Sequence, residues 1–155
     1  MKKPYESSMQ LSITDLFIVA NKKNVFLQKK VTMKEKLFFR NRDEARLVDP
    51  STILYVIADG HYSVFHLSTG ISFYLYVQLG DVLKKMQLQL HLTCEDFVRV
   101  GRSLIINLTY LHYILPAQGK LELLDKNLDK VVLDASEKSL RELADLLDNR
   151  FSVNH

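Results

Sequence analysis

Two arginines and a serine interrupt an apolar stretch at residues 97–111, and their types and spacing suit the binding of an anion. The stretch reads Phe-Val-Arg-Val-Gly-Arg-Ser-Leu-Ile-Ile-Asn-Leu-Thr-Tyr-Leu. Its β-branched and aromatic residues are typical of a buried strand, where an unpaired arginine is almost never found. Because Gly101 lies between Arg99 and Arg102, we predict a turn that presents guanidinium groups to solvent. Arginine binds phosphate oxygens or guanine edges through paired hydrogen bonds, and a hydroxyl such as that of Ser103 also binds phosphate.

His61 is a second candidate for a functional side chain. It directly follows the turn predicted at Asp59-Gly60, where the first side chain of a strand projects into solvent. Taken by itself, it is more simply interpreted as an ordinary turn histidine. Metal binding has little support, because no histidine belongs to a His-x-x-x-His motif or lies near paired cysteines. The five histidines are His61, His66, His91, His112 and His155.

The sequence carries no signature of an enzyme. Cys94 or Ser103 would need a base and an orienting carboxylate to act as a nucleophile, and neither a nucleophile elbow nor a Cys/His signature is present. The five glycines are scattered and form no phosphate-binding loop. We therefore expect no catalytic activity, no cofactor, no metal and no small-molecule substrate.

Length and composition predict one globular domain with a tail. The 155 residues are 47% hydrophobic and 25% charged, which argues against disorder. No apolar run reaches the roughly 18 to 20 residues of a membrane helix, and Pro4 and Glu6 interrupt any signal peptide. We interpret the protein as cytoplasmic, with no membrane partner. Residues 1–46 hold 11 Lys and Arg against 5 Asp and Glu. This excess fits either a polyanionic partner or a solvated lysine-rich tail.

Short strands are the elements that must position these residues. Alternating or β-branched runs between turn signals predict about eight to ten short strands in total, with a clear pattern from Leu37 onward. Apolar residues at helical spacing predict one helix over 79–90 and another from Leu140 to Leu147, capped by Asp134, Ser136 or Ser139. Residues 1–35 could form either an apolar hairpin or a broken helix, and their β-branched and aromatic content favours strands. The pattern as a whole predicts a β-dominated α+β domain with two short helices.

From about residue 36 to residue 148, the chain resembles the LytTR DNA-binding domain of bacterial transcription regulators. Three segments carry the resemblance in the expected order. The central segment, 97–107, is similar to the family signature Phe-x-Arg-x-His-Arg-Ser-x-Ile-Val-Asn. The outer segments are Ile53-Leu-Tyr-Val56 with the following Gly60-His61-Tyr62 and His66, and Ala135-Ser-Glu-Lys138 with the terminal helix.

The resemblance implies small antiparallel sheets laid side by side, whose loops enter successive major grooves of double-stranded DNA with repeated half-sites. His61, Arg102 and Lys138 would face the bases or the groove. Arg99 and Ser103 would support contacts to the backbone, and His66 is a weaker addition to the same site. The resemblance therefore implies a sequence-specific regulator of transcription, with a homodimer on DNA as one arrangement.

Two departures from the family pattern affect this site. Gly101 stands where the family usually has histidine, which removes one DNA contact and lets the backbone approach more closely. Glu137 and Lys138 replace an arginine-containing pair, which places a carboxylate beside the expected DNA face. Asn107 is expected to be structural, holding the turn that follows its strand.

The expected domain organisation is an N-terminal extension over 1–35, a LytTR-like domain over 36–148 and a C-terminal tail over 149–155. The extension would form a hairpin or a dimerisation segment, or supply lysines to phosphates. It is too short for the receiver domain that family members usually carry, so we interpret the chain as a stand-alone member.

Two other functions stay open at this stage. One is a protein-interaction module that pairs with another regulator and binds DNA weakly or not at all, an idea supported by Glu137 and the acidic balance of residues 47–155. The other is RNA binding through aromatic residues around Phe73, Tyr74 and Tyr76, although such residues are more often part of a core.

Overall fold

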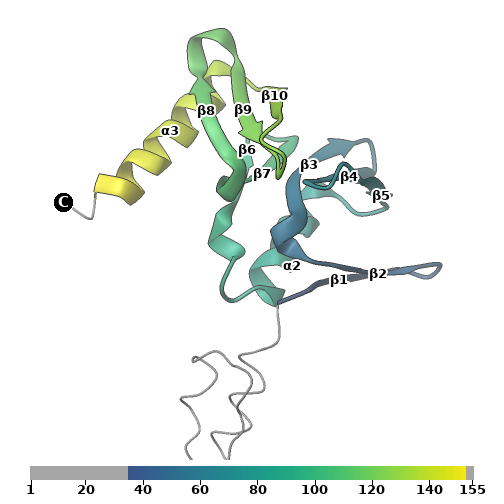
Figure 1. Cartoon of the computed structure of the whole chain (residues 1–155). Coiled ribbons are helices and arrows are strands. Elements are labelled where there is room, and N and C mark those ends of the chain that lie inside the picture. Colours follow the sequence, from purple (N-terminus) through teal and green to yellow (C-terminus); the bar gives the residue numbers. More distant parts are fainter. Residues whose placement is uncertain (1–34, 153–155) are drawn as a thin grey trace, which may run out of the picture. The chain divides into compact units, whose positions relative to one another are not determined.

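The computed structural model describes residues 35–152. The hairpin or broken helix expected within 1–34 and the last three residues lie outside this part of the chain. Figure 1 shows the described strands and helices in order. They are β1 (Leu37–Arg40), β2 (Ala45–Val48), β3 (Ile53–Asp59), β4 (Tyr62–Leu67), β5 (Ser72–Leu75), α2 (Leu79–Gln89), β6 (Phe97–Val100), β7 (Leu104–Asn107), β8 (Leu111–Leu115), β9 (Lys120–Leu124), β10 (Lys130–Asp134) and α3 (Glu137–Ser152).

Within residues 35–152 the strands form three antiparallel sheets. The central sheet has the order β5-β4-β3-β7-β6, and it lies between the β1-β2 hairpin and the sheet β10-β9-β8. Within residues 35–152 the hairpins expected from turn residues are present, including β3-β4 across Asp59-Gly60 and β6-β7 across residues 101–103. The prediction of a β-dominated fold with small antiparallel sheets and two helices is therefore confirmed.

The central sheet is buried on both faces at β7, where successive side chains point to opposite sides of the strand. On β7, Ile105 points into a core that contains α2 and the β1-β2 hairpin. Its neighbours Leu104 and Ile106 point into a second core with β9 and α3. This explains why β7 is continuously apolar rather than alternating.

The two helices pack through the faces that their periodicity predicted. On α2, Val82 and Met86 are fully buried, and the side-chain amide of Gln89 makes two hydrogen bonds to the backbone of Phe38 on β1, of 2.7 and 3.0 Å. On α3, Leu140 and Leu143 are buried. The helix α3 continues to Ser152, so its last turn occupies residues that the sequence assigned to the C-terminal tail.

Polar side chains hold the connections between these elements. The buried Asn107 donates from Nδ2 to the carbonyl of Ile53 and accepts from the amide of Thr109, at 2.9 and 3.0 Å, which confirms its structural role. Ser136 caps α3, because its Oγ accepts from the amide of Ser139 at 3.1 Å. Of the three caps that the sequence left open, Ser136 is the one used. Neither helix of the described part is long and apolar enough to span a membrane.

Candidate nucleic-acid interface

Two of the loops singled out by the sequence lie at the same end of the central sheet. Strands β3 and β7 are antiparallel neighbours, with Ile57 opposite Leu104. Beyond this pair, the amide of Ala58 donates to the carbonyl of Ser103 at 2.9 Å. The end of β3, which leads to His61, therefore lies beside the 101–103 turn that precedes β7.

The start of α3 joins the 101–103 turn. A Cβ built on Gly101 would lie 3.0 Å from Oγ of Ser139, closer than almost any Cβ contact in a protein. The φ angle of Gly101 is also positive, at 66°, which a residue with a side chain rarely adopts. Glycine at this position thus lets the turn close onto the first turn of α3. Arg102 and Lys138, which are 36 positions apart in the sequence, are brought to neighbouring surface segments.

The two arginines of this region have different environments. Nη2 of Arg99 donates to the carbonyl oxygen of Arg102 at 2.6 Å. Nη1 of Arg99 lies 3.4 Å from the point where a Cβ on Gly80 would be, at the start of α2. The Arg102 side chain is exposed, and no side chain among residues 35–152 forms a hydrogen bond or an ion pair with its guanidinium. One guanidinium is therefore turned to the protein backbone and the other to solvent.

Lys138 and Ser103 are also exposed. The carboxylate that accompanies Lys138 is neutralised within its own helix, because Glu137 accepts from Nε and Nη2 of Arg141 at 2.9 and 2.6 Å. Glu137, which departs from the family pattern by placing an acid beside the expected DNA face, is therefore balanced by the positive charge of Arg141. Such exposed ion pairs contribute little to stability, but they reduce the repulsion of a polyanion.

His66 lies away from these loops. It is partly buried in β4, where its ring stacks on Tyr55 at 4.4 Å and its Nδ1 is 2.8 Å from Oγ of Ser72. Burial lowers the pKa of the His66 imidazole. Its partner Tyr55 is four residues, or roughly 13 Å, from the end of β3. The structure thus brings together His61, Arg102, Ser103 and Lys138 at one end of the central sheet, but not His66.

A cluster of exposed tyrosines accompanies His61, and the sequence did not predict it as a unit. The ring of His61 is 6.2 Å from that of Tyr76, which contacts Tyr62 edge-on at 5.2 Å. Tyr74 joins the cluster through Tyr62. Because β4 and β5 pair with Val64 opposite Tyr74, these tyrosines share one face of the sheet. Only the strand register, which the sequence does not state, would have revealed the cluster.

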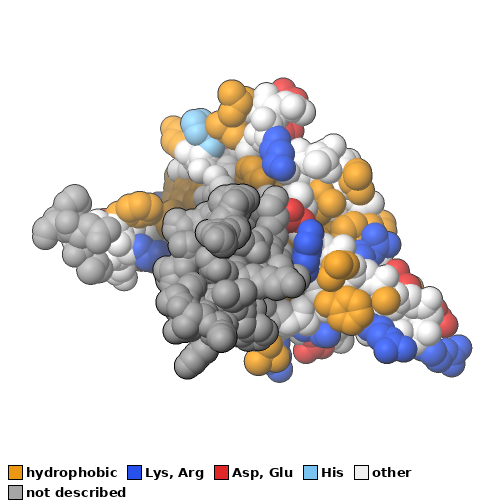
Figure 2. Space-filling view, turned by 60° about the horizontal axis from the view of Figure 1, so that its bottom comes forward, with side chains coloured by type: hydrophobic (Ala, Val, Ile, Leu, Met, Phe, Trp, Pro, Cys, Tyr) orange, Lys and Arg blue, Asp and Glu red, His pale blue; other side chains and the backbone are white. Residues whose placement is uncertain are grey.

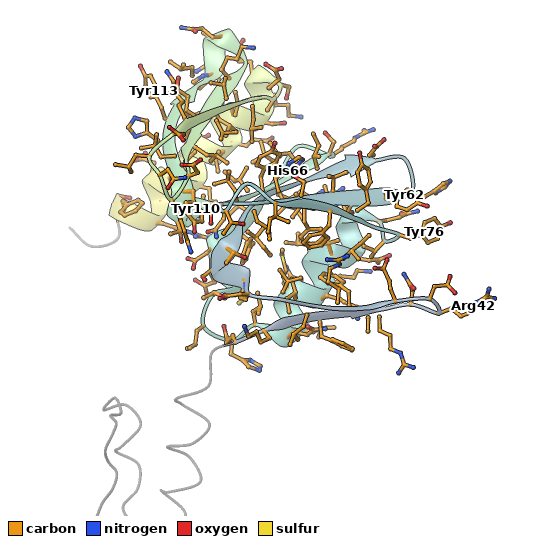
Figure 3. The ribbon with its side chains drawn as sticks, turned by 45° about the vertical axis from the view of Figure 1, so that its right-hand side comes forward. Arg42, Tyr62, His66, Tyr76, Tyr110 and Tyr113 are labelled. Atoms are coloured by element: carbon orange, nitrogen blue, oxygen red, sulfur yellow. The ribbon has the colours of Figure 1, made fainter. Side chains whose placement is uncertain are left out.

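An open groove of about 500 Å³ runs between Tyr62 and Tyr76 on one side and the β1-β2 turn, residues 41–44, on the other. Figure 3 shows both tyrosines at the end of the central sheet and Arg42 at the tip of the hairpin. In Figure 2, Lys and Arg side chains are interspersed with apolar and acidic ones and do not form one basic patch. On the face shown in Figure 2, the distribution of charge alone therefore does not identify a DNA-binding surface.

Of the aromatic residues that the sequence suggested for RNA binding, Phe73 belongs to the core, because it stacks on Phe65 at 5.0 Å and lies under the guanidinium of Arg46. Tyr74 and Tyr76 are exposed. Among residues 35–152 there is no group of three or more His, Cys, Asp and Glu side chains that could hold a metal ion.

Comparisons with known proteins place this arrangement in a family. The sequence model of the LytTr DNA-binding domain matches residues 43–148. A solved structure with the same fold is the LytTr DNA-binding domain of a protein described as a methyl-accepting/DNA response regulator from Bacillus cereus. It is 19% identical, with a TM-score of 0.51, and the match covers 74% of this chain and 98% of that one. No curated protein sequence matches the chain. The family match spans more than half of the sequence, and the chain therefore belongs to the LytTR DNA-binding domain family of transcription regulators.

Proposed function

We propose that this protein binds double-stranded DNA sequence-specifically and regulates transcription by inserting the loops at one end of its central sheet into the major groove. The observation that carries the proposal is the exposed Arg102, whose guanidinium has no side-chain partner within residues 35–152 and whose turn is held against α3. Because the backbone of this turn is already held, it loses little conformational freedom when DNA binds.

The proposed contacts follow from the chemistry of each side chain. Arg102 suits paired hydrogen bonds to O6 and N7 of guanine, the most common specific contact in the major groove. Lys138 is a point charge at the start of α3 and suits a phosphate, as does the hydroxyl of Ser103. His61 projects from the β3-β4 turn at the same end of the sheet and reads a neighbouring position.

One domain of this size covers one half-site, so a target with two repeated half-sites would hold two copies. Half-sites one helical turn apart, about 34 Å, present their major grooves on the same side of the duplex. Selection of bound sequences from a random duplex library tests this directly. Repeats at a fixed spacing support the proposal, and recovery of unrelated sequences contradicts it.

The role of Arg102 is tested with the selected duplex and a scrambled duplex across a salt titration. Arg102→Ala should lower specific affinity by about 1–3 kcal/mol while leaving the fold intact, because the side chain is exposed. The matched control is Arg42→Ala, which removes another exposed guanidinium, from the β1-β2 turn. Equal losses for the two variants would contradict the assignment to Arg102.

The exposed tyrosine cluster favours a second candidate, a module that docks onto another regulator. Tyr62, Tyr74 and Tyr76 are 45%, 57% and 61% exposed, and aromatic residues are enriched in protein interfaces. The dependence of duplex binding on salt distinguishes the two functions. DNA binding requires that affinity fall steeply with salt, whereas a slope near zero would favour the interaction module.

A further inference from the structure

We propose that Arg99 is a positioning residue that holds the 101–103 turn in the shape required by Arg102, and that it is not itself a DNA contact. This inference rests on the proposed function, because it assigns Arg99 a role in that same site. The resemblance to the family had grouped Arg99 with the residues that support backbone contacts to DNA.

The first observation is the direction of the Arg99 side chain. Arg99 lies on β6 opposite Ile105, one pair before the turn closes. Its side chain runs along the turn, and Nη2 donates to the carbonyl oxygen of Arg102 at 2.6 Å. A hydrogen bond from a charged donor is shorter and stronger than one between neutral groups. The bond fixes the orientation of the peptide group that follows Arg102.

The second observation is the helix beside the same guanidinium. Nη1 of Arg99 lies 3.4 Å from the position that a Cβ on Gly80 would occupy, so the guanidinium lies beside the first turn of α2. The amino-terminal end of a helix carries a partial positive charge, so a cation there does not stabilise the helix. The placement of Arg99 is instead explained by what it does for the turn.

The third observation is that the two residues flanking Arg102 in the turn, Gly101 and Ser103, also contact other elements. Ala58 of β3 donates to the carbonyl of Ser103, and Gly101 packs against Ser139 of α3. Arg99 fixes a third point of the turn through its hydrogen bond to the carbonyl oxygen of Arg102. Without it, the backbone at Arg102 would rotate more freely, and the Arg102 guanidinium would sample directions away from the groove.

The free protein supplies the first test, by NMR of the full chain. Arg99→Met keeps the length and the apolar stem but removes the charge and the donors. We expect the backbone amide shifts of Gly101, Arg102 and Ser103 to change and their lines to broaden. Arg102→Met is the control and should leave the turn unchanged, since it removes only an exposed side chain. If Arg99→Met perturbs the turn no more than the control does, the proposal is overturned.

DNA binding supplies the second test. Arg99→Met should lower the affinity for the selected duplex about tenfold, within the range of one good base contact. Its affinity for a scrambled duplex, and the dependence of that affinity on salt, should stay the same. A direct phosphate contact would instead weaken binding to every duplex and reduce the slope of log K against log salt by about 0.9, which would overturn the proposal.

A general loss of stability would also lower DNA binding, so thermal melting of each variant is measured alongside. Arg99 is exposed, and substitutions at exposed positions usually change the free energy of unfolding by less than about 0.5 kcal/mol. A large fall in Tm for Arg99→Met, accompanied by loss on both duplexes, would mean a merely structural role. If the wild-type protein selects no specific duplex, the proposed function fails, while the NMR comparison still decides whether Arg99 holds the turn.

Discussion

Two turns of this protein present an exposed arginine, and they are held in different ways. The β1-β2 turn is held locally: Oδ1 of Asn41 accepts from the amides of Asp43 and Glu44, each at 2.9 Å. Its Arg42 is 93% exposed and lies 3.5 Å from the carboxylate of Asp43. The 101–103 turn is held by residues from β6, β3 and α3. Local hydrogen bonds are sufficient to make a hairpin, whereas long-range contacts fix the direction of one side chain.

The two arginines also differ in the acidic groups near them. Arg42 has an acidic neighbour within its own turn, so a polyanion gains little by approaching it. Next to the 101–103 turn, the acid Glu137 is already paired with Arg141. The comparison separates a hairpin tip that carries its own acid from a turn whose neighbouring acid already has a basic partner.

The largest effect on stability is expected at the glycine where the 101–103 turn meets α3. Gly101→Ala introduces both an unfavourable positive φ and a Cβ within 3.0 Å of Ser139, and should lower the free energy of unfolding by about 2–3 kcal/mol. Gly60→Ala is the matched control, because Gly60 has a φ of 62° and nothing within 4 Å of its Cβ position. It should cost about 1 kcal/mol. Equal losses in urea unfolding would mean that the contact with α3 is not tight.

The next effect is expected at the cap of α3, which loosens one support of the same turn. Ser136→Ala removes the acceptor for the amide of Ser139 and should lower the free energy of unfolding by about 1 kcal/mol. Ser152→Ala, at the other end of α3, should change it by less than about 0.5 kcal/mol. Chemical denaturation of the pair measures the difference. A cap variant as stable as the Ser152 variant would show that α3 begins without help from Ser136.

A smaller effect is expected at the locally held turn. Asn41→Ala removes the side-chain acceptor of two amides and should lower the free energy of unfolding by about 0.5–1 kcal/mol. Its affinity for the selected duplex should stay within about twofold of the wild type, since surface changes away from a site usually have little effect. Titration of the duplex by fluorescence anisotropy checks this. A tenfold loss would place the β1-β2 turn in the DNA interface and remove the distinction between the two turns.

The smallest effect is expected at His66, which lies outside both turns. Burial lowers its pKa from the usual 6.5, so the unfolded chain takes up the proton first as the pH falls. The free energy of unfolding should therefore be unaffected by His66 above pH 6.5, fall as the pH drops from 6.5 through the folded pKa, and level off below it. Urea midpoints of the wild type and of His66→Gln across this range isolate the contribution. Parallel curves for the two proteins would contradict the prediction.

Local patterns predicted most of the fold. Alternation and turn residues located the β3-β4 and β6-β7 hairpins, and helical spacing located the buried faces of α2 and α3, because these signals act within one element. The pairing of residues far apart was not predictable. Gly101 and Ser139 are 38 positions apart, and their contact depends on how α3 packs on the sheet.

The candidate site shows the same limit. The exposed positions of His61, Arg102 and Lys138 agree with their local sequence signals. The sequence suggested that Arg99 supports contacts to the DNA backbone, and it did not indicate that the Arg99 guanidinium donates to the carbonyl oxygen of Arg102. The tyrosine cluster needed the register of β4 against β5. Individual residue types thus indicate what chemistry is available, while register and packing decide which side chains can use it.

The double-sided burial of β7 has a consequence for how the protein opens. Leu104, Ile105 and Ile106 are at most 4% exposed and point alternately into both cores. Neither core can open while the other keeps this strand in place, so the amides of β7 should be among the last to exchange with deuterium. The turn that carries Arg102 leads directly into this buried strand. The side chain proposed to read DNA is thus attached to a strand that we expect to leave the two cores only when much of the domain unfolds.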